Sequence, residues 1–292
     1  VPERQSLLLM ASRRCGLECA YCPVGRAGPE MTMATARKAV DWLMTSRAPV
    51  LELGFMGGEP LSRLDWMAKV VAYARSKSGG RTLQVFVPTN CLTLDDKAIS
   101  WLREAGATAL LGLDGGFEHC GSRFGSDRAA YKKAAAAVGR LREAGVEHTV
   151  NCVIGPEEAD SLAARLGALS ALGAGRVQVS YRAGVAWPQA AADAFARELT
   201  AAARLNRPEL MNLRNEAEPM LLKNGIILDE EGRAWLDNAL FLERDFPSLR
   251  RSHGLGKLGS LAPRDEVVVA PRAVLERAAS AFAPGSEEGR DS

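Results

Sequence analysis

A regular alternation of short apolar runs and longer amphipathic segments extends over the first two thirds of this 292-residue chain. Short apolar runs bounded by turn residues are typical of buried strands, and apolar residues at helical spacing are typical of packed helices. We expect strands over residues 6–11, 50–56, 83–87, 108–113, 146–154 and 176–181, and helices over residues 32–46, 61–76, 94–104, 128–143, 156–172 and 189–205. Six such units imply parallel strands joined by right-handed crossovers. The predicted fold class is α/β, a partial (β/α)6 TIM-like barrel.

The pattern changes after residue 205. Residues 226–228 and 233–236 flank the turn sequence Asp229-Glu230-Glu231-Gly232 and predict a β-hairpin. A glycine-rich stretch over 254–259 and a helix over 272–282 follow, and the chain from residue 283 on is rich in Gly, Ser and charge. We therefore predict a barrel over residues 1–205, a small α+β extension over residues 206–283 and a flexible tail over residues 284–292.

Composition excludes several classes of protein. Hydrophobic residues make up 47% of the chain, enough for a sizeable core. The 37 Lys and Arg residues and 35 Asp and Glu residues give a formal net charge of +2 with no single-sign block, which argues against nucleic-acid and membrane partners. The six cysteines do not form a secreted disulfide pattern, and the sequence shows no signal peptide and no apolar run of membrane-spanning length. A reducing cytoplasm is the expected location.

Three cysteines stand close together directly after the first predicted strand. Cys15, Cys19 and Cys22 have the spacing C-x3-C-x2-C. Three thiolates are too few for a structural zinc site, which takes four protein ligands. They suit a cubane iron–sulfur cluster in which one iron lacks a protein ligand. That open iron is a place where a further molecule can bind.

The cysteine spacing, with Tyr21 before the last cysteine and Gly57-Gly58-Glu59-Pro60 about one helix downstream, resembles the radical S-adenosylmethionine (SAM) superfamily. The resemblance implies that the three cysteines hold one [4Fe-4S] cluster and that SAM chelates its open iron. It also implies that Tyr21 supports the adenine or the cluster and that the GGEP motif meets the SAM amine. The alternative is a chance zinc or disulfide fragment, which the GGEP motif disfavours.

Two further segments resemble motifs of the same superfamily. Thr89-Asn90-Cys91 is similar to its TNG motif, with Cys91 in place of glycine. The segment Gly112 to Gly115 is similar to its SLDG motif, which implies that Asp114 bonds a ribose hydroxyl or orders the loop; a plain turn Asp is the alternative. Arg123 matches the basic residue that contacts the SAM carboxylate in this family. The chain departs from the pattern where Gly112 replaces a serine and where His119-Cys120 replaces His-Asp.

All of these residues follow predicted strands. Working groups of such barrels lie at the carboxyl ends of the strands, where the loops converge. The cysteines follow the first strand, GGEP the second, Asn90 the third and Asp114 the fourth. We therefore expect one site at that edge of the sheet.

The remaining cysteines and one histidine are weaker candidates. Cys152 lies in an apolar strand and is expected in the core. Cys91 and Cys120 lie on loops at the predicted mouth, where a thiol can donate a hydrogen atom to a substrate radical; the alternative is that each is a small buried residue. His119 is a candidate acid or base, or else a residue with a local hydrogen bond.

The C-terminal layout resembles the SPASM or twitch extension of peptide-modifying radical SAM enzymes, in which cysteines hold auxiliary clusters. No cysteine follows Cys152, so we expect a degenerate extension that keeps the shape without the metal. The resemblance implies an enzyme that cleaves SAM to a 5′-deoxyadenosyl radical and modifies a ribosomally made peptide by crosslinking, epimerisation or another side-chain change.

Several alternatives stay open for the substrate and the partners. A small metabolite such as a sugar, nucleoside or amino acid is the second candidate substrate, and an activating enzyme for a glycyl radical on a partner is the third. A non-catalytic protein that binds SAM or an iron–sulfur cluster is the remaining class. An external one-electron donor, flavodoxin or ferredoxin, is implied because no second redox centre is encoded. A separate protein that recognises the peptide is a further expected partner.

Overall fold

The computed structural model describes residues 2–26, 28–182, 185–204, 208–211, 225–236, 240 and 253–267. Its described strands form one sheet in the order β10-β9-β8-β1-β2-β3-β4-β5-β6-β7. The strands are β1 (Arg4–Ser12), β2 (Val50–Gly57), β3 (Thr82–Thr89), β4 (Ala107–Gly112), β5 (His148–Ile154), β6 (Arg176–Tyr181), β7 (Glu209–Leu210), β8 (Ile226–Leu228), β9 (Arg233–Leu236) and β10 (Gly254–Lys257). Neighbours from β8 through β1 to β7 pair in parallel, and β9 and β10 pair antiparallel.

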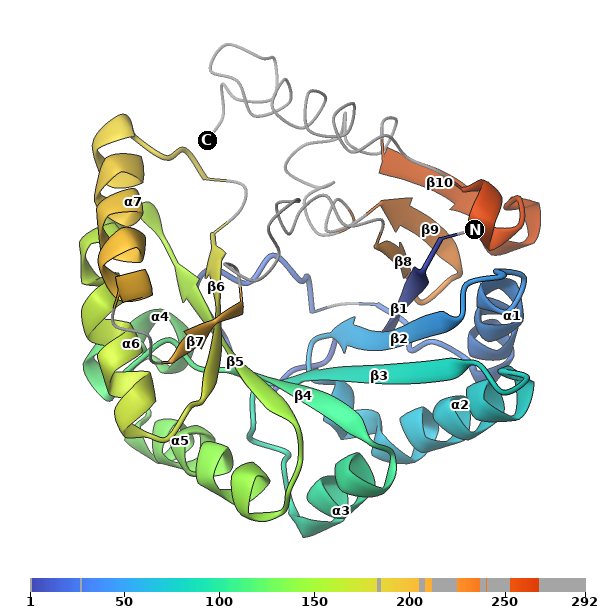
Figure 1. The fold of residues 1–292 in the computed structure, drawn as a ribbon, viewed down its shortest axis with the longest axis horizontal. Coiled ribbons are helices and arrows are strands. Elements are labelled where there is room, and N and C mark those ends of the chain that lie inside the picture. The colour runs from blue at the N-terminus through green and yellow to red at the C-terminus, as the bar shows by residue number, and fades with distance from the viewer. Residues whose placement is uncertain are drawn as a thin grey trace.

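The helices lie on the outer side of the curved sheet (Figure 1). They are α1 (Met33–Leu43), α2 (Leu64–Lys77), α3 (Asp96–Glu104), α4 (Gly121–Phe124), α5 (Arg128–Glu143), α6 (Leu162–Ala171) and α7 (Gln189–Arg204). This arrangement confirms the predicted partial barrel of six parallel strands. Two predicted helices begin differently, since 3-10 turns, η1 (Pro60–Arg63) and η3 (Pro156–Ser161), precede α2 and α6. A proline begins each turn, and proline suits a first helical position because its missing N–H is not needed there.

The core lies between the sheet and the helices. Alternate strand residues face it, including Leu7 and Leu9 of β1, Val85 of β3 and Val150 and Cys152 of β5, all at most 1% exposed. Cys152 is thus a core residue, as predicted. The intervening residues face the concave side of the sheet, because side chains alternate along a strand. Within the described residues, no helix combines the length and the apolar character that a membrane span requires.

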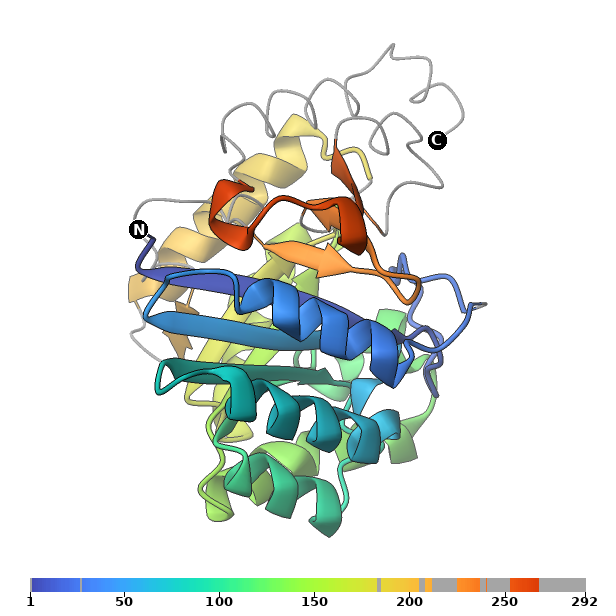
Figure 2. The same ribbon diagram turned by 90° about the vertical axis from the view of Figure 1, so that its right-hand side faces the viewer.

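The described strands of the C-terminal part extend the same sheet. Strand β8 pairs with the free edge of β1 at Leu8–Ile227 and Leu9–Leu228, and the predicted hairpin of β8 and β9 is present. Figure 2 shows this orange hairpin lying along the blue β1. The predicted domain boundary at residue 205, the predicted helix over 272–282 and the tail over 284–292 fall outside the described residues.

Arg264 connects the last described segment to β1. Arg264, in the 3-10 turn η6 (Arg264–Glu266), is fully buried and donates hydrogen bonds from Nε and Nη2 to the Ser6 carbonyl oxygen at 3.3 and 3.1 Å. Its guanidinium lies 5.6 Å from the centre of the Trp42 ring. Burial lowers the pKa of Arg264 to about 10. The segment is therefore packed against the barrel and not merely tethered to it.

Candidate functional site

The carboxyl ends of β1 to β4 bring the predicted site residues to one edge of the sheet. The loop of Cys15, Cys19 and Cys22 leaves β1, and two of its cysteines are half-buried while Cys22 is exposed. The Leu17 backbone N–H and the Asn90 side-chain Nδ2 donate to the Cys15 Sγ at 3.4 and 3.3 Å. Hydrogen bonds to sulfur stabilise a thiolate ligand and tune an iron–sulfur cluster. Asn90 therefore connects the loop after β3 to the first cysteine.

Cys19 lies close enough to the other two cysteines for their charges to affect it. Burial raises the pKa of Cys19 to about 11, the Arg123 guanidinium opposes the rise, and the neighbouring Cys22 and Cys15 add to it. In the part of the chain that the structure describes, no three His, Cys, Asp or Glu side chains are grouped to hold a single metal ion. A cubane cluster does not need such a group, because each cysteine binds its own iron. Three neighbouring thiols on one loop thus fit a cluster.

The glycines of the GGEP motif are explained by close packing against the cysteine loop. A side chain at Gly57 would overlap the Ser12 carbonyl oxygen, and one at Gly58 would overlap the Arg14 carbonyl oxygen. Gly57 also has φ of +128°, which favours glycine. The backbone N–H groups of Gly58 and Glu59 donate to those same carbonyl oxygens, each at 2.8 Å. The motif therefore holds the start of the cysteine loop.

The Glu59 carboxylate accepts hydrogen bonds from several donors of the protein itself. Its Oε1 accepts from the Thr89 hydroxyl at 3.0 Å and the Leu61 N–H at 3.1 Å, and its Oε2 accepts from the Asn90 N–H at 2.7 Å. The residue is 2% exposed, and burial raises its pKa while these donors oppose the rise. Pro60, next in the motif, begins η1. Glu59 thus joins the GGEP motif to the loop after β3, and its contact with the SAM amine stays a prediction.

Asp114 and Arg123 form a buried pair. Arg123 donates from Nε to Asp114 Oδ2 at 3.0 Å and from Nη2 to Oδ1 at 2.9 Å. The Tyr21 hydroxyl donates to Oδ2 at 2.8 Å, and the Val153 N–H donates to Oδ1 at 2.9 Å. The guanidinium also lies 5.4 Å from the centre of the Tyr21 ring. Asp114 therefore connects the cysteine loop, β4 and β5, and the sequence-based roles in SAM binding stay predictions for all three residues.

The glycine at position 112, where the family motif has serine, makes room for this pair. A side chain at Gly112 would overlap the Arg123 guanidinium. The two hydrogen bonds that Arg123 donates to the Asp114 carboxylate fix the plane of the guanidinium. The departure from the motif at Gly112 and the buried position of Arg123 are thus one structural feature.

The family model described as the radical SAM superfamily matches residues 9–165, more than half of the 292-residue chain. The chain belongs to the radical SAM superfamily. This family uses a [4Fe-4S] cluster and SAM, which agrees with the cysteine loop described above.

Curated relatives of this radical SAM chain include peptide cyclases. The PqqA peptide cyclase of Gluconobacter oxydans is 28% identical over 187 residues, which cover 62% of this chain and 50% of the relative. The PqqA peptide cyclase of Bradyrhizobium diazoefficiens is 30% identical over 154 residues, covering 51% and 39%. An uncharacterized protein of Methanocaldococcus jannaschii is 27% identical over 110 residues, covering 37% and 38%. The chain thus spans half or less of the length of these relatives.

Solved structures share the radical SAM fold. Native anSMEcpe with bound AdoMet and Cp18Cys peptide aligns with a TM-score of 0.75 and 17% identity, over 97% of this chain and 85% of that one. Streptococcus suis SuiB bound to the precursor peptide SuiA aligns with a TM-score of 0.59 and 12% identity, over 78% and 58%. At these identities the likeness concerns the fold.

The two thiols predicted to donate a hydrogen atom to a substrate radical are buried in this radical SAM chain. Cys91 is 1% exposed and Cys120 is 0% exposed, and their Sγ atoms donate to the carbonyl oxygens of Thr89 at 3.8 Å and Gly115 at 3.6 Å. Burial raises the pKa of both thiols, that of Cys120 to about 12. The loops are at the mouth, as predicted, but neither thiol reaches its surface. His119 has its Nδ1 3.4 Å from a Glu118 carboxylate oxygen.

A polar cluster on the concave face was missed by the sequence analysis. Asn151 Oδ1 accepts from the Ser180 hydroxyl at 2.6 Å and from Gln178 Nε2 at 3.3 Å. These residues alternate with the core residues of β5 and β6, so they face away from the helices and are half-buried. Leu8, Phe86 and Leu110 are half-buried on the other strands. The period of two in β5 and β6 is the signal that could have found the cluster.

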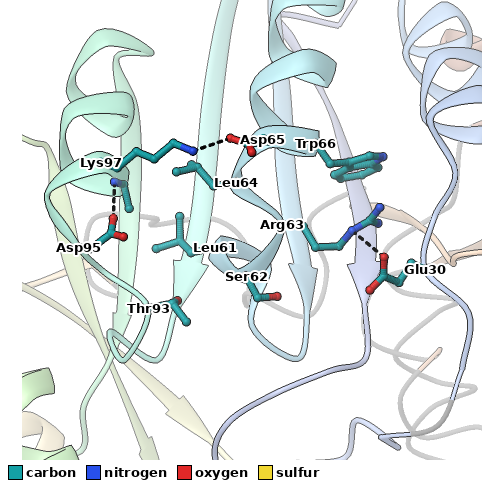
Figure 3. A pocket seen from close by; sticks show the side chains of 11 residues that line it. Glu30, Leu61, Ser62, Arg63, Leu64, Asp65, Trp66, Thr93, Asp95 and Lys97 are labelled. Carbon is teal, nitrogen blue, oxygen red and sulfur yellow. Dashed lines mark hydrogen bonds and ion pairs between the residues drawn. The ribbon is translucent and has the colours of Figure 1, made fainter.

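A pocket of about 380 Å³ lies beside the GGEP motif, between η1 and the start of α3 (Figure 3). Two ion pairs line it, Arg63 with Glu30 at 3.3 Å and Lys97 with Asp65 at 2.8 Å, and Asp95 accepts from the Ala98 N–H at 2.8 Å. Arg63 also donates from Nη1 to the carbonyl oxygens of Ala11 and Met31 at 2.6 and 2.9 Å. No sequence motif points to Arg63, which fastens both ends of the cysteine loop to η1.

Proposed function

We propose that this chain is a radical SAM enzyme that modifies a peptide by crosslinking, epimerisation or another change of a side chain. The observation that carries the proposal is the three-cysteine loop packed on the GGEP motif at the carboxyl edge of the barrel. The peptide part is supported by the peptide cyclases among its relatives and by neighbours solved with bound peptides.

The proposal gives roles to residues of the cysteine loop and its neighbours. Cys15, Cys19 and Cys22 hold the cluster, and the Leu17 N–H and Asn90 side chain fix the position of the Cys15 sulfur by hydrogen bonds. A cluster held there would supply the electron for cleavage of SAM, and SAM would supply the radical that removes a hydrogen atom from the substrate. GGEP and Asn90 would hold SAM, and Asp114 with Arg123 keeps Tyr21 of the cysteine loop in place.

The concave face suits a ligand with both apolar and amide groups. Leu8, Phe86 and Leu110 offer an apolar surface, and Asn151 and Gln178 offer amides. A peptide carries both kinds of group at fixed spacing, whereas a sugar would leave the apolar side unused. An external one-electron donor, flavodoxin or ferredoxin, and a separate peptide-recognition protein complete the proposal.

The test is anaerobic reconstitution with iron and sulfide, followed by SAM and dithionite, with 5′-deoxyadenosine measured by mass spectrometry. We expect about four irons per chain, as one cubane requires, and deoxyadenosine formation. Cys19→Ala should abolish both. Cys152→Ala removes a buried thiol that donates to the Asp114 carbonyl oxygen, and it serves as the matched control that should retain both.

The peptide part is tested with candidate precursor peptides by mass spectrometry of the reacted peptide. A SAM-dependent change in peptide mass or stereochemistry supports the proposal. Deoxyadenosine formation that is coupled to a sugar or nucleoside, and to no peptide, would replace it by metabolite tailoring. Four irons with SAM binding but no cleavage in any of these mixtures would favour a binding protein.

A further inference from the structure

The turn of the C-terminal hairpin lies beside the start of the cysteine loop. Strand β8 is parallel to β1, with Leu228 opposite Leu9, so both strands run out at the same edge of the sheet. Beyond them come Glu230 in the hairpin turn and Arg13, two residues before Cys15. Figure 2 shows the end of the orange hairpin next to the blue loop that follows β1. The topology thus joins residues that are 217 positions apart in sequence.

Glu230 and Arg13 form a two-pronged ion pair. Arg13 donates from Nε to Glu230 Oε1 at 2.7 Å and from Nη2 to Oε2 at 3.4 Å. The Glu230 side chain is 3% exposed and that of Arg13 is 20% exposed. A carboxylate so far removed from water needs a charged partner. Among the described residues, Arg13 is the cation that meets it.

The returning part of the cysteine loop rests on the same pair. A side chain at Gly28 would come within 2.8 Å of Arg13 Cδ and 3.5 Å of Glu230 Oε1. Gly28 follows the last cysteine by six residues, so the loop passes the pair both before and after its cysteines. Movement of the Arg13 side chain would therefore change the packing at both ends of the cysteine loop.

Asp229 fixes the hairpin turn that presents Glu230. Its Oδ1 accepts from the backbone N–H groups of Glu231 and Arg233 at 3.0 and 2.9 Å, and its Oδ2 accepts from Arg233 Nε at 2.7 Å. Asp229 is fully buried. An Asp that bonds backbone groups two and four residues ahead makes a rigid turn. Glu230 is therefore held in place by its own element, and Arg13 docks on a fixed carboxylate.

We infer that Glu230 is a positioning residue for the cluster, acting through Arg13 on the cysteine loop. GGEP holds the backbone of residues 12–14 from the β2 side, and Glu230 holds the loop from the hairpin side. The extension has no cysteine in this sequence, and it contributes to the cluster site through the ion pair of Glu230 with Arg13. The inference rests on the proposed function, because it assumes that the loop binds a cluster.

The experiment compares Glu230→Gln and Arg13→Gln with two matched controls in the reconstituted 292-residue chain. Glu231→Gln changes the next residue of the same turn, which is 54% exposed, and Arg47→Gln changes an arginine outside the cysteine loop, which is 77% exposed. The readouts are iron per chain, the rate of iron release to a chelator, and the electron paramagnetic resonance (EPR) spectrum of the reduced cluster with and without SAM. Hydrogen exchange of residues 12–26 and the unfolding temperature of the iron-free chain are measured alongside.

We expect Glu230→Gln and Arg13→Gln each to release iron about tenfold faster, in line with losses seen for groups that orient metal ligands. The double variant should release iron at nearly the same rate as either single variant, because both substitutions break the same ion pair. Exchange should rise in residues 12–26, and both controls should match the wild type. Unchanged iron release and EPR spectra in both variants, with a wild type that holds four irons, would overturn the inference alone. A wild type that binds no cluster would instead overturn the proposed function. Faster release that adds fully in the double variant would show independent effects and also overturn the inference.

Discussion

At the scale of single residues, Cys91 has a backbone conformation that favours glycine. It has φ of +69°, the one positive value at a non-glycine position among the described residues. This conformation is unfavourable by about 1–2 kcal/mol for a residue with a Cβ, and by more for a β-branched residue. We expect Cys91→Gly to change the free energy of unfolding by less than about 1 kcal/mol, because relief of strain offsets the lost packing of a buried thiol.

Cys91→Val should be destabilising by about 2 kcal/mol or more, measured by urea unfolding of the iron-free chain under reducing conditions.

The Cys91→Gly variant also tests whether the thiol donates a hydrogen atom to the substrate radical. Because the structure covers the thiol, we expect SAM cleavage and product formation to persist in Cys91→Gly. Loss of product with intact SAM cleavage would restore Cys91 as a donor.

Gly112 gives a second prediction at this scale. Gly112→Ser restores the motif residue, but its side chain would overlap the Arg123 guanidinium and push it off Asp114. A disturbed buried ion pair costs about 3–5 kcal/mol when one partner is lost, so we expect a decrease of about 2–4 kcal/mol in the free energy of unfolding. Gly139→Ser, on α5 with open space around it, is the matched control and should not destabilise. Equal effects of the two substitutions would contradict the assigned packing.

At the scale of elements, the hairpin of β8 and β9 is held by Asp229. Four donors converge on its carboxylate, including Trp235 Nε1 at 3.3 Å. Asp229→Ala leaves these donors without an acceptor, and we expect a loss of about 2–4 kcal/mol in the free energy of unfolding. Glu231→Ala, in the same turn and exposed, should change it by less than about 0.5 kcal/mol. Chemical unfolding followed by tryptophan fluorescence measures both, and a mild Asp229→Ala variant would mean that the strand pairing alone sets the turn.

At the scale of the whole molecule, the extension and the barrel share one sheet. A chain that ends at residue 211 loses β8 from the edge of β1 and loses the Arg264 and Ala262 contacts with Ser6 and Trp42. An uncovered strand edge and its exposed apolar neighbours promote association. We expect this chain to aggregate or to unfold at a lower temperature, as measured by size-exclusion chromatography and calorimetry. A chain that ends at residue 267 keeps every contact described above and is the control. A stable monomer ending at 211 would show that the extension is an independent unit.

The sequence by itself determined the sheet and the edge at which the site lies. The alternation of strand and helix patterns sets the parallel order β1 to β6, because right-handed crossovers leave few other arrangements. Motifs that follow strands must then meet at one edge, as Cys15, Gly58, Asn90 and Asp114 do. Local pattern also predicted the hairpin from its turn residues.

Only the tertiary structure decided which partners these residues have. Asp114 accepts a hydrogen bond from Tyr21, 93 residues away in the sequence, and Glu230 accepts one from Arg13, 217 residues away. Such pairs depend on strand register and on which strand covers the edge of β1, and neither is written in local periodicity. The burial of Cys91 and Cys120 and the overlap of a side chain at position 112 with the Arg123 guanidinium have the same origin. They arise because side chains distant in sequence compete for the same volume in a close-packed interior.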